Sequence, residues 1–288
     1  MNILILGITG KIGKLVFKLL PKEKNLQFFF THRDIKPKFL NRENVFKCDL
    51  GCSAQVELFS RSLEGRIDVV ISMTGIKATN VKDYNQNIKL AHSIDKLTTG
   101  LGAKKLIYFS SSAVYGKGQS HIENGQTKPI GYYGLSKKKS EDILLKKSIG
   151  KYCLNILRVA NVAGADALLS QMRFNRKIVE SIKIEVFRND RGAIRNYIDP
   201  VTLVEILIAL SKTRKKIPHL LNVGSLKPVD MKELVRVSVF DWIAVSPEIS
   251  STQKITINSK KLADLFPQIS LDLSAESIVR RLKALEFI

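Results

Sequence analysis

The residues best spaced to do chemistry together are a tyrosine and a lysine, Tyr133 and Lys137. On a helix, residues four apart share one face, so the phenol and the ammonium can point into the same cleft. A neutral tyrosine is a poor base at neutral pH, and a nearby cation favours its phenolate form. The pair therefore predicts an acid/base that takes a proton from an alcohol, or gives one to a ketone, as hydride moves. Tyr132 competes for this role, but the residue four positions after it, Ser136, is uncharged.

A run of serines could supply a hydroxyl for the same reaction. Ser110, Ser111 and Ser112 follow the apolar segment that ends at Phe109. If that segment is a strand of a parallel sheet, its carboxyl end faces the ligand crevice, where a hydroxyl can hydrogen-bond the reacting oxygen. Taken alone, the run would fit an ordinary serine-rich loop better.

Three glycines near the beginning of the chain are spaced for binding a dinucleotide. Gly7, Gly10 and Gly13 follow the apolar run Ile3–Leu6 and lead into an amphipathic stretch. Glycines let the backbone turn tightly and approach a pyrophosphate, and the N-terminus of the following helix offers free N–H groups. A tight structural turn could use the same residues, but the strand–turn–helix context favours a dinucleotide.

The elements that must position these residues alternate between short apolar strands and amphipathic helices. The predicted strands are Ile3–Leu6, Gln27–Thr31, Val69–Ser72, Lys105–Ser110 and Leu154–Arg158. The predicted helices are Ile12–Leu20, Val56–Leu63, Val81–Thr99 and Tyr133–Lys147. This alternation is typical of an α/β protein with a doubly wound parallel sheet covered on both faces. We predict that residues 1–164 form this dinucleotide-binding domain.

The alternation loosens after residue 164. The predicted elements there are a helix over Leu168–Ile182, strands over Ile184–Phe187 and Arg195–Ile198, a helix over Pro200–Leu210 and a final amphipathic stretch, Ala275–Leu285. We interpret residues 165–288 mainly as a smaller lobe that closes over the cofactor and holds the substrate, with some segments returning to the first domain.

Composition narrows the class of protein. The chain has 288 residues, 44% of them hydrophobic, and no apolar run reaches the roughly 18 residues needed to span a bilayer. The start carries no basic leader, so we expect a cytoplasmic protein. The three cysteines, Cys48, Cys52 and Cys153, make neither a disulfide framework nor a zinc pair, and no metal is expected.

The charge is strongly positive: 47 Lys and Arg against 26 Asp and Glu give +21. Such a field attracts anions and could bind nucleic acid weakly. No tract interleaves aromatic with basic residues, as a base-stacking surface would. We therefore expect phosphorylated ligands, or a merely lysine-rich composition, and no specific nucleic-acid partner.

Together these motifs resemble the extended short-chain dehydrogenase/reductase family, especially its nucleotide-sugar epimerases, dehydratases and 4-keto reductases. The matching segments are Gly7 to Gly13, Ser111 to Gly116, Tyr133 with Lys137, Leu157 to Gly164, Arg195 to Asp199, Asn222 to Gly224 and Ser259 to Leu262. The resemblance implies a doubly wound parallel Rossmann sheet with a smaller C-terminal substrate-binding lobe.

The resemblance also implies a role for individual residues. Ser111 would be the catalytic hydroxyl, Tyr133 the acid/base, and Lys137 the residue that also holds the nicotinamide ribose. The implied substrate-binding residues are Ser111, Ser112, Asn161 and Arg195, where the arginine would contact the nucleotide diphosphate and Arg173 and Arg176 are weaker options. The implied cofactor-binding residues are Gly7, Thr9, Gly10, Lys11, Ile12, Gly13, Thr31, His32, Arg33, Asp49, Leu50, Met73, Thr74, Gly75, Tyr133 and Lys137.

The end of the second strand bears on the choice of cofactor. Members of the family that prefer NAD place an acid there, but this chain has Thr31, and Asp34 follows three residues later. Arg33, and with it His32, could instead meet a 2′-phosphate. We predict a preference for NADP over NAD, although Arg33 could also be an ordinary solvated residue.

Three functions stay open. The missing acid favours reduction of a 4-keto nucleotide sugar by NADPH, which is the first prediction. The alternative is a nucleotide-sugar C4 epimerase with tightly bound NAD. The third is a non-catalytic dinucleotide-binding or RNA-associated relative. A dehydratase is disfavoured because Ser112 and Ala113 occupy the places of the usual Asp-Glu pair.

The resemblance further implies a homodimer. In this family, the helix of the catalytic tyrosine and the preceding long helix commonly pack against their copies in a four-helix bundle. On the long helix, apolar side chains are available for core or interface packing: Ile88, Ala91, Ile94 and Leu97.

Overall fold

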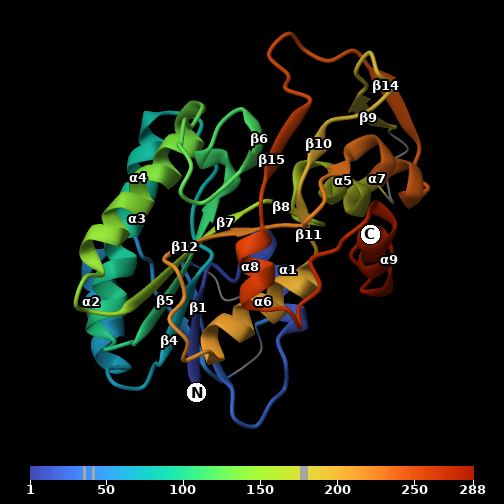
Figure 1. The fold of residues 1–288 in the computed structure, drawn as a ribbon. Helices are drawn as coiled ribbons and strands as arrows, with labels where there is room; N and C mark the ends of the chain where they lie inside the picture. The colour runs from blue at the N-terminus through green and yellow to red at the C-terminus, as the bar shows by residue number, and fades with distance from the viewer. Residues whose placement is uncertain (35–36, 41–42, 176–180) are drawn as a thin grey trace.

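The structure is a computed structural model that describes residues 1–34, 37–40, 43–175 and 181–288. At its centre is a seven-stranded sheet with the strand order β12-β7-β5-β4-β1-β2-β3, in which every neighbouring pair is parallel. The strands are β1 (Asn2–Leu6), β2 (Gln27–His32), β3 (Val45–Lys47), β4 (Val69–Ser72), β5 (Lys105–Ser111), β7 (Cys153–Val159) and β12 (Leu220–Val223). Figure 1 shows this sheet with helices on both sides.

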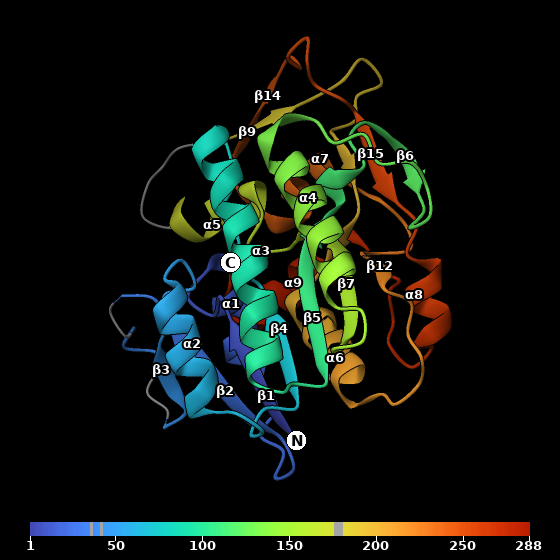
Figure 2. The same cartoon turned by 90° about the vertical axis from the view of Figure 1, so that its left-hand side faces the viewer.

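Alternating side chains of the central strands feed two separate cores. Ile3 and Ile5 of β1 belong to one hydrophobic cluster, and Leu4 and Leu6 belong to the other. This is the two-residue period of a strand that is buried on both faces. The helices α1 (Lys11–Leu19) and α6 (Pro200–Lys212) complete the first core. The helices α2 (Ser53–Ser62), α3 (Val81–Gly100) and α4 (Gly131–Lys147) complete the second core, on the face turned to the viewer in Figure 2. The predicted doubly wound fold is confirmed.

Three of the apolar residues of α3 pack inside a single chain. Ala91, Ile94 and Leu97 are at most 1% exposed and belong to the core beneath α2 and α4. Of the two predicted uses of these side chains, packing against the parent sheet is the one that the structure shows. Ile88 is partly buried.

The second lobe is built from short strands that are distant in sequence. One sheet has the order β13 (Val229–Asp230), β10 (Ile194–Arg195), β15 (Lys254–Ile257) and β6 (Gly118–His121). Two-stranded pairs join β14 (Trp242–Val245) to β9 (Ile182–Glu185), and β11 (Tyr197–Ile198) to β8 (Asn161–Val162). The remaining helices are η1 (Ser112–Val114), α5 (Ala167–Asn175), α7 (Met231–Ser238), α8 (Lys260–Leu265) and α9 (Ala275–Ala284).

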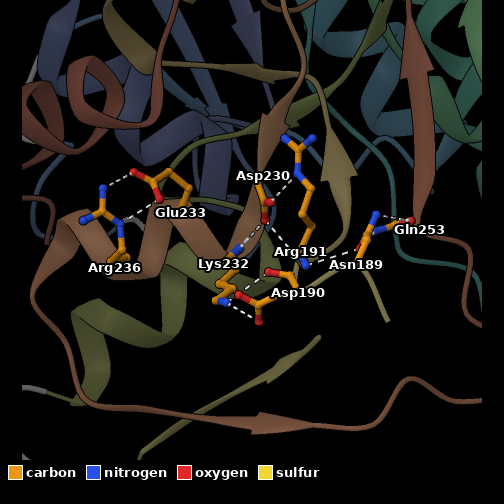
Figure 3. A network of polar contacts seen from close by, with 9 residues as sticks. Asn189, Asp190, Arg191, Asp230, Lys232, Glu233, Arg236 and Gln253 are labelled. Carbon is orange, nitrogen blue, oxygen red and sulfur yellow. Dashed lines mark hydrogen bonds and ion pairs between the residues drawn. The ribbon is translucent and has the colours of Figure 1, made fainter. Parts of the chain in front are cut away.

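The turn after β9 is fastened to the start of α7 by an exposed polar network (Figure 3). Asp230 caps α7 by accepting from the Lys232 N–H at 2.9 Å, and it also accepts from the Gly192 N–H at 3.0 Å. Arg191 pairs with Asp230 at 3.2 Å, and the Lys232 ammonium lies 2.7 Å from Asp190. Exposed ion pairs of this kind contribute little stability each, about 0–1 kcal/mol. The network therefore sets the path of the turn more than the stability of the lobe.

Three predicted elements of this lobe are wrong in extent. The strand predicted over Ile184–Phe187 is β9, which covers Ile182–Glu185. The helix predicted over Leu168–Ile182 ends at Asn175, residues 176–180 lie outside the described residues, and Ile182 begins β9. Ile182 and Ile184 are buried while Lys183 is exposed, which is the period of a strand. The strand predicted over Arg195–Ile198 is divided between β10 and β11. Asn196 lies between them: its carbonyl accepts from the Asn161 N–H, and its side chain bonds to the Ser225 carbonyl and the Ile257 N–H.

None of the helices described is long and apolar enough to cross a membrane.

Candidate active site

The predicted pair Tyr133 and Lys137 lies in the first two turns of α4. Lys137 is 4% exposed, and its ammonium donates to the Phe109 carbonyl at 2.9 Å and the Thr74 carbonyl at 3.1 Å. It is therefore fixed between the carboxyl ends of β5 and β4. Burial lowers the pKa of Lys137, against the opposing effect of negative charge on Tyr133 and Glu141. Tyr133 is half-buried.

Ser111 is brought to the same end of the sheet by β5. Its hydroxyl accepts from the Ala113 N–H at 3.2 Å and so caps the short helix η1. Gly134 lets α4 approach this turn closely, because a Cβ atom there would lie only 2.6 Å from the Ala113 carbonyl oxygen. The close approach places Tyr133 beside the serine turn.

Tyr133 and the serines line a cavity of about 500 Å³ between the sheet and the second lobe. All the residues predicted on the substrate side line it: Ser111, Ser112, Asn161 and Arg195. Sequence reasoning missed other lining residues, which are Ala113, Gly116, Lys117, Ile130, Ala160, Asn196, Ser250, Thr252, Ile255 and Ile257. Most of them come from the β6, β10 and β15 regions, which the lobe sheet unites.

Arg195 is held rigidly at the edge of this cavity. Its guanidinium donates to the carbonyls of Ile194, Gln253 and Thr252, each at 2.8 Å. Burial lowers its pKa from the usual value, while Tyr197 and Glu185 oppose this. The alternatives named for the diphosphate, the side chains of Arg173 and Arg176, lie outside the described residues.

A second cavity, of about 490 Å³, follows the glycine turn and the ends of β2, β3 and β4. Eleven of the predicted cofactor residues line it: Gly7, Thr9, Gly10, Thr31, His32, Arg33, Asp49, Leu50, Met73, Thr74 and Gly75. The other predicted residues, Lys11, Ile12, Gly13, Tyr133 and Lys137, are not among its lining residues.

The glycine turn has the geometry that a dinucleotide needs. Gly7 has φ +83° and passes so close to β4 that a Cβ would lie 2.9 Å from the Met73 backbone. Gly13 packs α1 against the turn, since a Cβ there would lie 2.3 Å from the Gly7 carbonyl oxygen. A side chain at Gly7 would clash with β4, and one at Gly13 would push α1 away from the turn. The turn therefore fits a bound pyrophosphate at the N-terminus of α1.

Asp34, which follows the expected position of the acid by three residues, nevertheless reaches this second cavity. Asp34 lines it together with Arg33, and the two side chains form an exposed ion pair at 2.9 Å. Asp34 raises the pKa of Arg33 by accepting its hydrogen bond. The cavity thus holds a cation and an acid side by side after β2.

A buried ion pair behind α4 was not predicted from the sequence. Glu141, one turn after Lys137, is 0% exposed and pairs with Arg158 of β7 at 2.8 Å. Ser110 donates to Glu141 at 2.5 Å, and Arg158 also donates to the Tyr115 hydroxyl at 3.0 Å. Burial acts to lower the pKa of Arg158, but bonding to Glu141 outweighs it and the pKa is raised. The pair ties α4 to β5, β7 and the serine turn.

Comparison with known proteins agrees with this arrangement. A family model described as "NAD dependent epimerase/dehydratase family" matches residues 3–224. The putative UDP-arabinose 4-epimerase 4 of Arabidopsis thaliana is 28% identical over 261 residues, which are 78% of this chain and 55% of that protein. The probable UDP-arabinose 4-epimerase 3 of the same plant is 30% identical over 78% of this chain and 58% of its own length. The chain thus spans a little more than half of these relatives.

Solved structures share the fold. The UDP-glucose 4-epimerase from Brucella ovis in complex with NAD has a TM-score of 0.81 at 17% identity, covering 97% of this chain and 96% of that one. The UDP-glucuronic acid 4-epimerase from Bacillus cereus, in complex with UDP-glucuronic acid and NAD, has a TM-score of 0.78 at 19% identity, covering 99% and 100%. With the family model matching most of its length, the chain belongs to the NAD dependent epimerase/dehydratase family.

Proposed function

We propose that this chain is a nicotinamide-dependent 4-epimerase of a nucleotide-linked sugar. One observation carries the proposal: α4 joins the two cavities. Tyr133 lines the cavity of about 500 Å³, which we call the substrate cavity. Lys137, one turn later, bonds to the Thr74 carbonyl, and Thr74 lines the cavity of about 490 Å³, which we call the dinucleotide cavity. This arrangement supports an acid/base role for Tyr133 at the point where a sugar and a nicotinamide would meet.

The residues of this chain then have distinct tasks. Tyr133 takes the proton of the sugar hydroxyl at C4 and later returns it to the ketone oxygen. Ser111 hydrogen-bonds that oxygen, and Lys137 favours the ionised form of the phenol. A bound NAD would supply the hydride acceptor and donor that this exchange at C4 requires.

The named relatives favour 4-epimerisation over reduction by NADPH, which was the first prediction. The relatives and the structural neighbours described above are 4-epimerases by name, and both neighbours are complexes with NAD. Their names also favour UDP as the nucleotide. The non-catalytic alternative is disfavoured because Ser111, Tyr133 and Lys137 are all present and gathered at one end of the sheet.

The direct test is turnover without added cofactor. Purified protein is incubated with UDP-glucose, UDP-xylose or UDP-glucuronate, and the products are followed by NMR. An epimerase yields the C4 epimer of at least one substrate and retains its dinucleotide. If none is converted unless NADPH is added and consumed, the epimerase proposal fails.

Reduction with NADPH stays as a second candidate because Arg33 lines the dinucleotide cavity. That candidate requires NADPH to bind about tenfold or more tighter than NADH, as expected for a charge-assisted bond to phosphate. Asp34 stands against it, since a carboxylate beside Arg33 repels a 2′-phosphate and can accept the ribose hydroxyls. We expect wild-type protein to bind NADH at least as tightly as NADPH.

Substitutions in the Arg33–Asp34 pair should shift this selectivity in opposite directions. Asp34→Ala frees Arg33 and is expected to favour NADPH by about tenfold, whereas Arg33→Ala favours NADH. Calorimetry near 0.15 M salt limits the diffuse attraction of the +21 charge. Arg61→Ala, which removes the same charge from an exposed ion pair with Glu57, is the matched control. A tenfold NADPH preference in the wild type, lost in Arg33→Ala, would support the reductase instead.

We also propose a homodimer formed through α3 and α4. On α4, Tyr132 and Leu135 are 42% and 44% exposed, which leaves apolar surface available for a second copy. Light scattering should give twice the 32.3 kDa mass of the chain at micromolar concentration, and a mass of 32.3 kDa would contradict the dimer.

A further inference from the structure

The substrate cavity has an unbalanced charge. Lys117 and Arg195 line it, and no acidic residue occurs among the described residues that line it with them. Another lysine of the chain, Lys261, is neutralised by an ion pair with the buried Glu123 at 3.2 Å. Lys117 has no ion pair within the part of the chain that the structure describes. A ligand with negative charge at two places would complement this cavity.

Lys117 is presented by a turn that is fixed on both sides. Gly116 has φ +77°, and a Cβ there would lie 2.0 Å from the Lys128 carbonyl oxygen. Gly118 has φ +135°, and a Cβ there would lie 2.7 Å from the His121 ring. Just before the turn, Tyr115 is 1% exposed and donates to the Asn222 side chain at 2.7 Å. The backbone at Lys117 is therefore set by packing.

The two cations occupy different places. Arg195 is paired in register with Ile255 of the middle strand β15, and Ile255 is paired with Gly118 of β6 (Figure 1). Two strand spacings separate Arg195 from Gly118, a backbone distance of about 10 Å. Arg195 is also held by three backbone carbonyls, which limits its movement toward β6. The cations are thus suited to two different anionic groups.

Lys117 lines the same cavity as Ser111 and Tyr133. A Cβ on Gly116 would lie 3.5 Å from the side chain of Ile130, and Ile130 stands three residues before Tyr133. The same turn continues from η1, which follows Ser111. If the diphosphate lies at Arg195 and the sugar C4 at Tyr133, Lys117 is the cation of this cavity left to meet an anionic group on the sugar.

We propose that the preferred substrate is a nucleotide sugar whose sugar is a uronic acid, and that Lys117 binds its carboxylate. The carboxylate of a hexuronic acid is attached to C5, next to the reacting carbon. This inference rests on the proposed function, and it makes Lys117 a specificity-determining residue for that reaction. A charge-assisted bond to carboxylate is strong enough to separate acidic from neutral sugars by about tenfold or more.

The test compares three ligands by calorimetry on the cofactor-loaded protein: UDP-glucuronate, UDP-glucose and UDP. Wild-type protein should bind UDP-glucuronate about tenfold or more tighter than UDP-glucose. Lys117→Met should remove most of that difference and change the affinity for UDP and UDP-glucose by less than about threefold. Lys128→Met, an exposed lysine of the same segment outside the cavity lining, should change none of the three affinities.

Two results would overturn the inference. The first is equal wild-type affinity for the acidic and neutral sugars. The second is an equal loss of affinity for all three ligands in Lys117→Met, which would assign the lysine to the diphosphate. Epimer formation measured in parallel separates this inference from the proposed function. Preferential binding of UDP-glucuronate without any epimer leaves the substrate inference and rejects the epimerase; epimerisation without that preference does the reverse.

Discussion

Replacing Tyr133 by phenylalanine is expected to lower turnover by about 10²–10⁴-fold, the usual contribution of a positioned general acid/base. The substitution removes only the hydroxyl and keeps the aromatic ring in the first turn of α4, where it lines the substrate cavity. Tyr133 does not line the dinucleotide cavity, so the affinity for the nicotinamide dinucleotide should change by less than about threefold. Steady-state kinetics and calorimetry on the same preparation measure both effects.

Tyr132→Phe is the control for this prediction. Tyr132 is 42% exposed and is absent from the lining of both cavities. Its loss of a hydroxyl should leave turnover unchanged. Activity of Tyr133→Phe within tenfold of wild type would remove Tyr133 from the chemistry.

The largest effect on stability is expected at Glu141. Glu141→Ala leaves the guanidinium of Arg158, which is 3% exposed, without its buried counterion. Breaking a buried ion pair on one side costs about 3–5 kcal/mol in the free energy of unfolding. Glu141→Gln should cost less because the amide can still bond to Ser110 and Arg158. Urea unfolding of each variant gives the comparison.

Glu57 provides a matched surface carboxylate. It pairs with Arg61 and Lys96 on exposed helix faces, so Glu57→Ala should leave the unfolding midpoint almost unchanged. A Glu141→Ala protein as stable as wild type would show that the buried pair is not needed to hold α4 against β7.

The central sheet was predictable because its signal is local. The strand Val69–Ser72 has the predicted bounds; β1, β2 and β5 differ from their predictions by one residue at one end, and β7 differs by one residue at each end. Each is an apolar run buried on both faces, and such runs are legible without knowledge of their neighbours. Strands of the second lobe, such as β10 and β6, have two to four residues. Their existence depends on pairing with distant segments, which a local pattern does not reveal.

The site residues show the same difference between local patterns, which the sequence reveals, and contacts with distant segments, which it does not. Tyr133 and Lys137 were recognised because helical spacing alone puts them on one face. Glu141 continues that face at the next i+4 position, but a charged residue on a helix normally faces water, and only Arg158 of β7 makes its burial possible. Lys117 lines the substrate cavity only because two flanking glycines and the pairing of β6 with β15 bring it there. Asp34 reaches the dinucleotide cavity through the path of the loop after β2.

The central claim is that hydride leaves C4 and returns to C4 within one active site. Its most direct test uses UDP-glucuronate and UDP-glucose carrying deuterium at C4, incubated with the purified protein without added dinucleotide. We predict that the C4 epimer forms from at least one of them and keeps the deuterium at C4, as seen by NMR and mass spectrometry. An epimer that has lost its deuterium to water, or a product that forms only as added NADPH is consumed, would contradict the account.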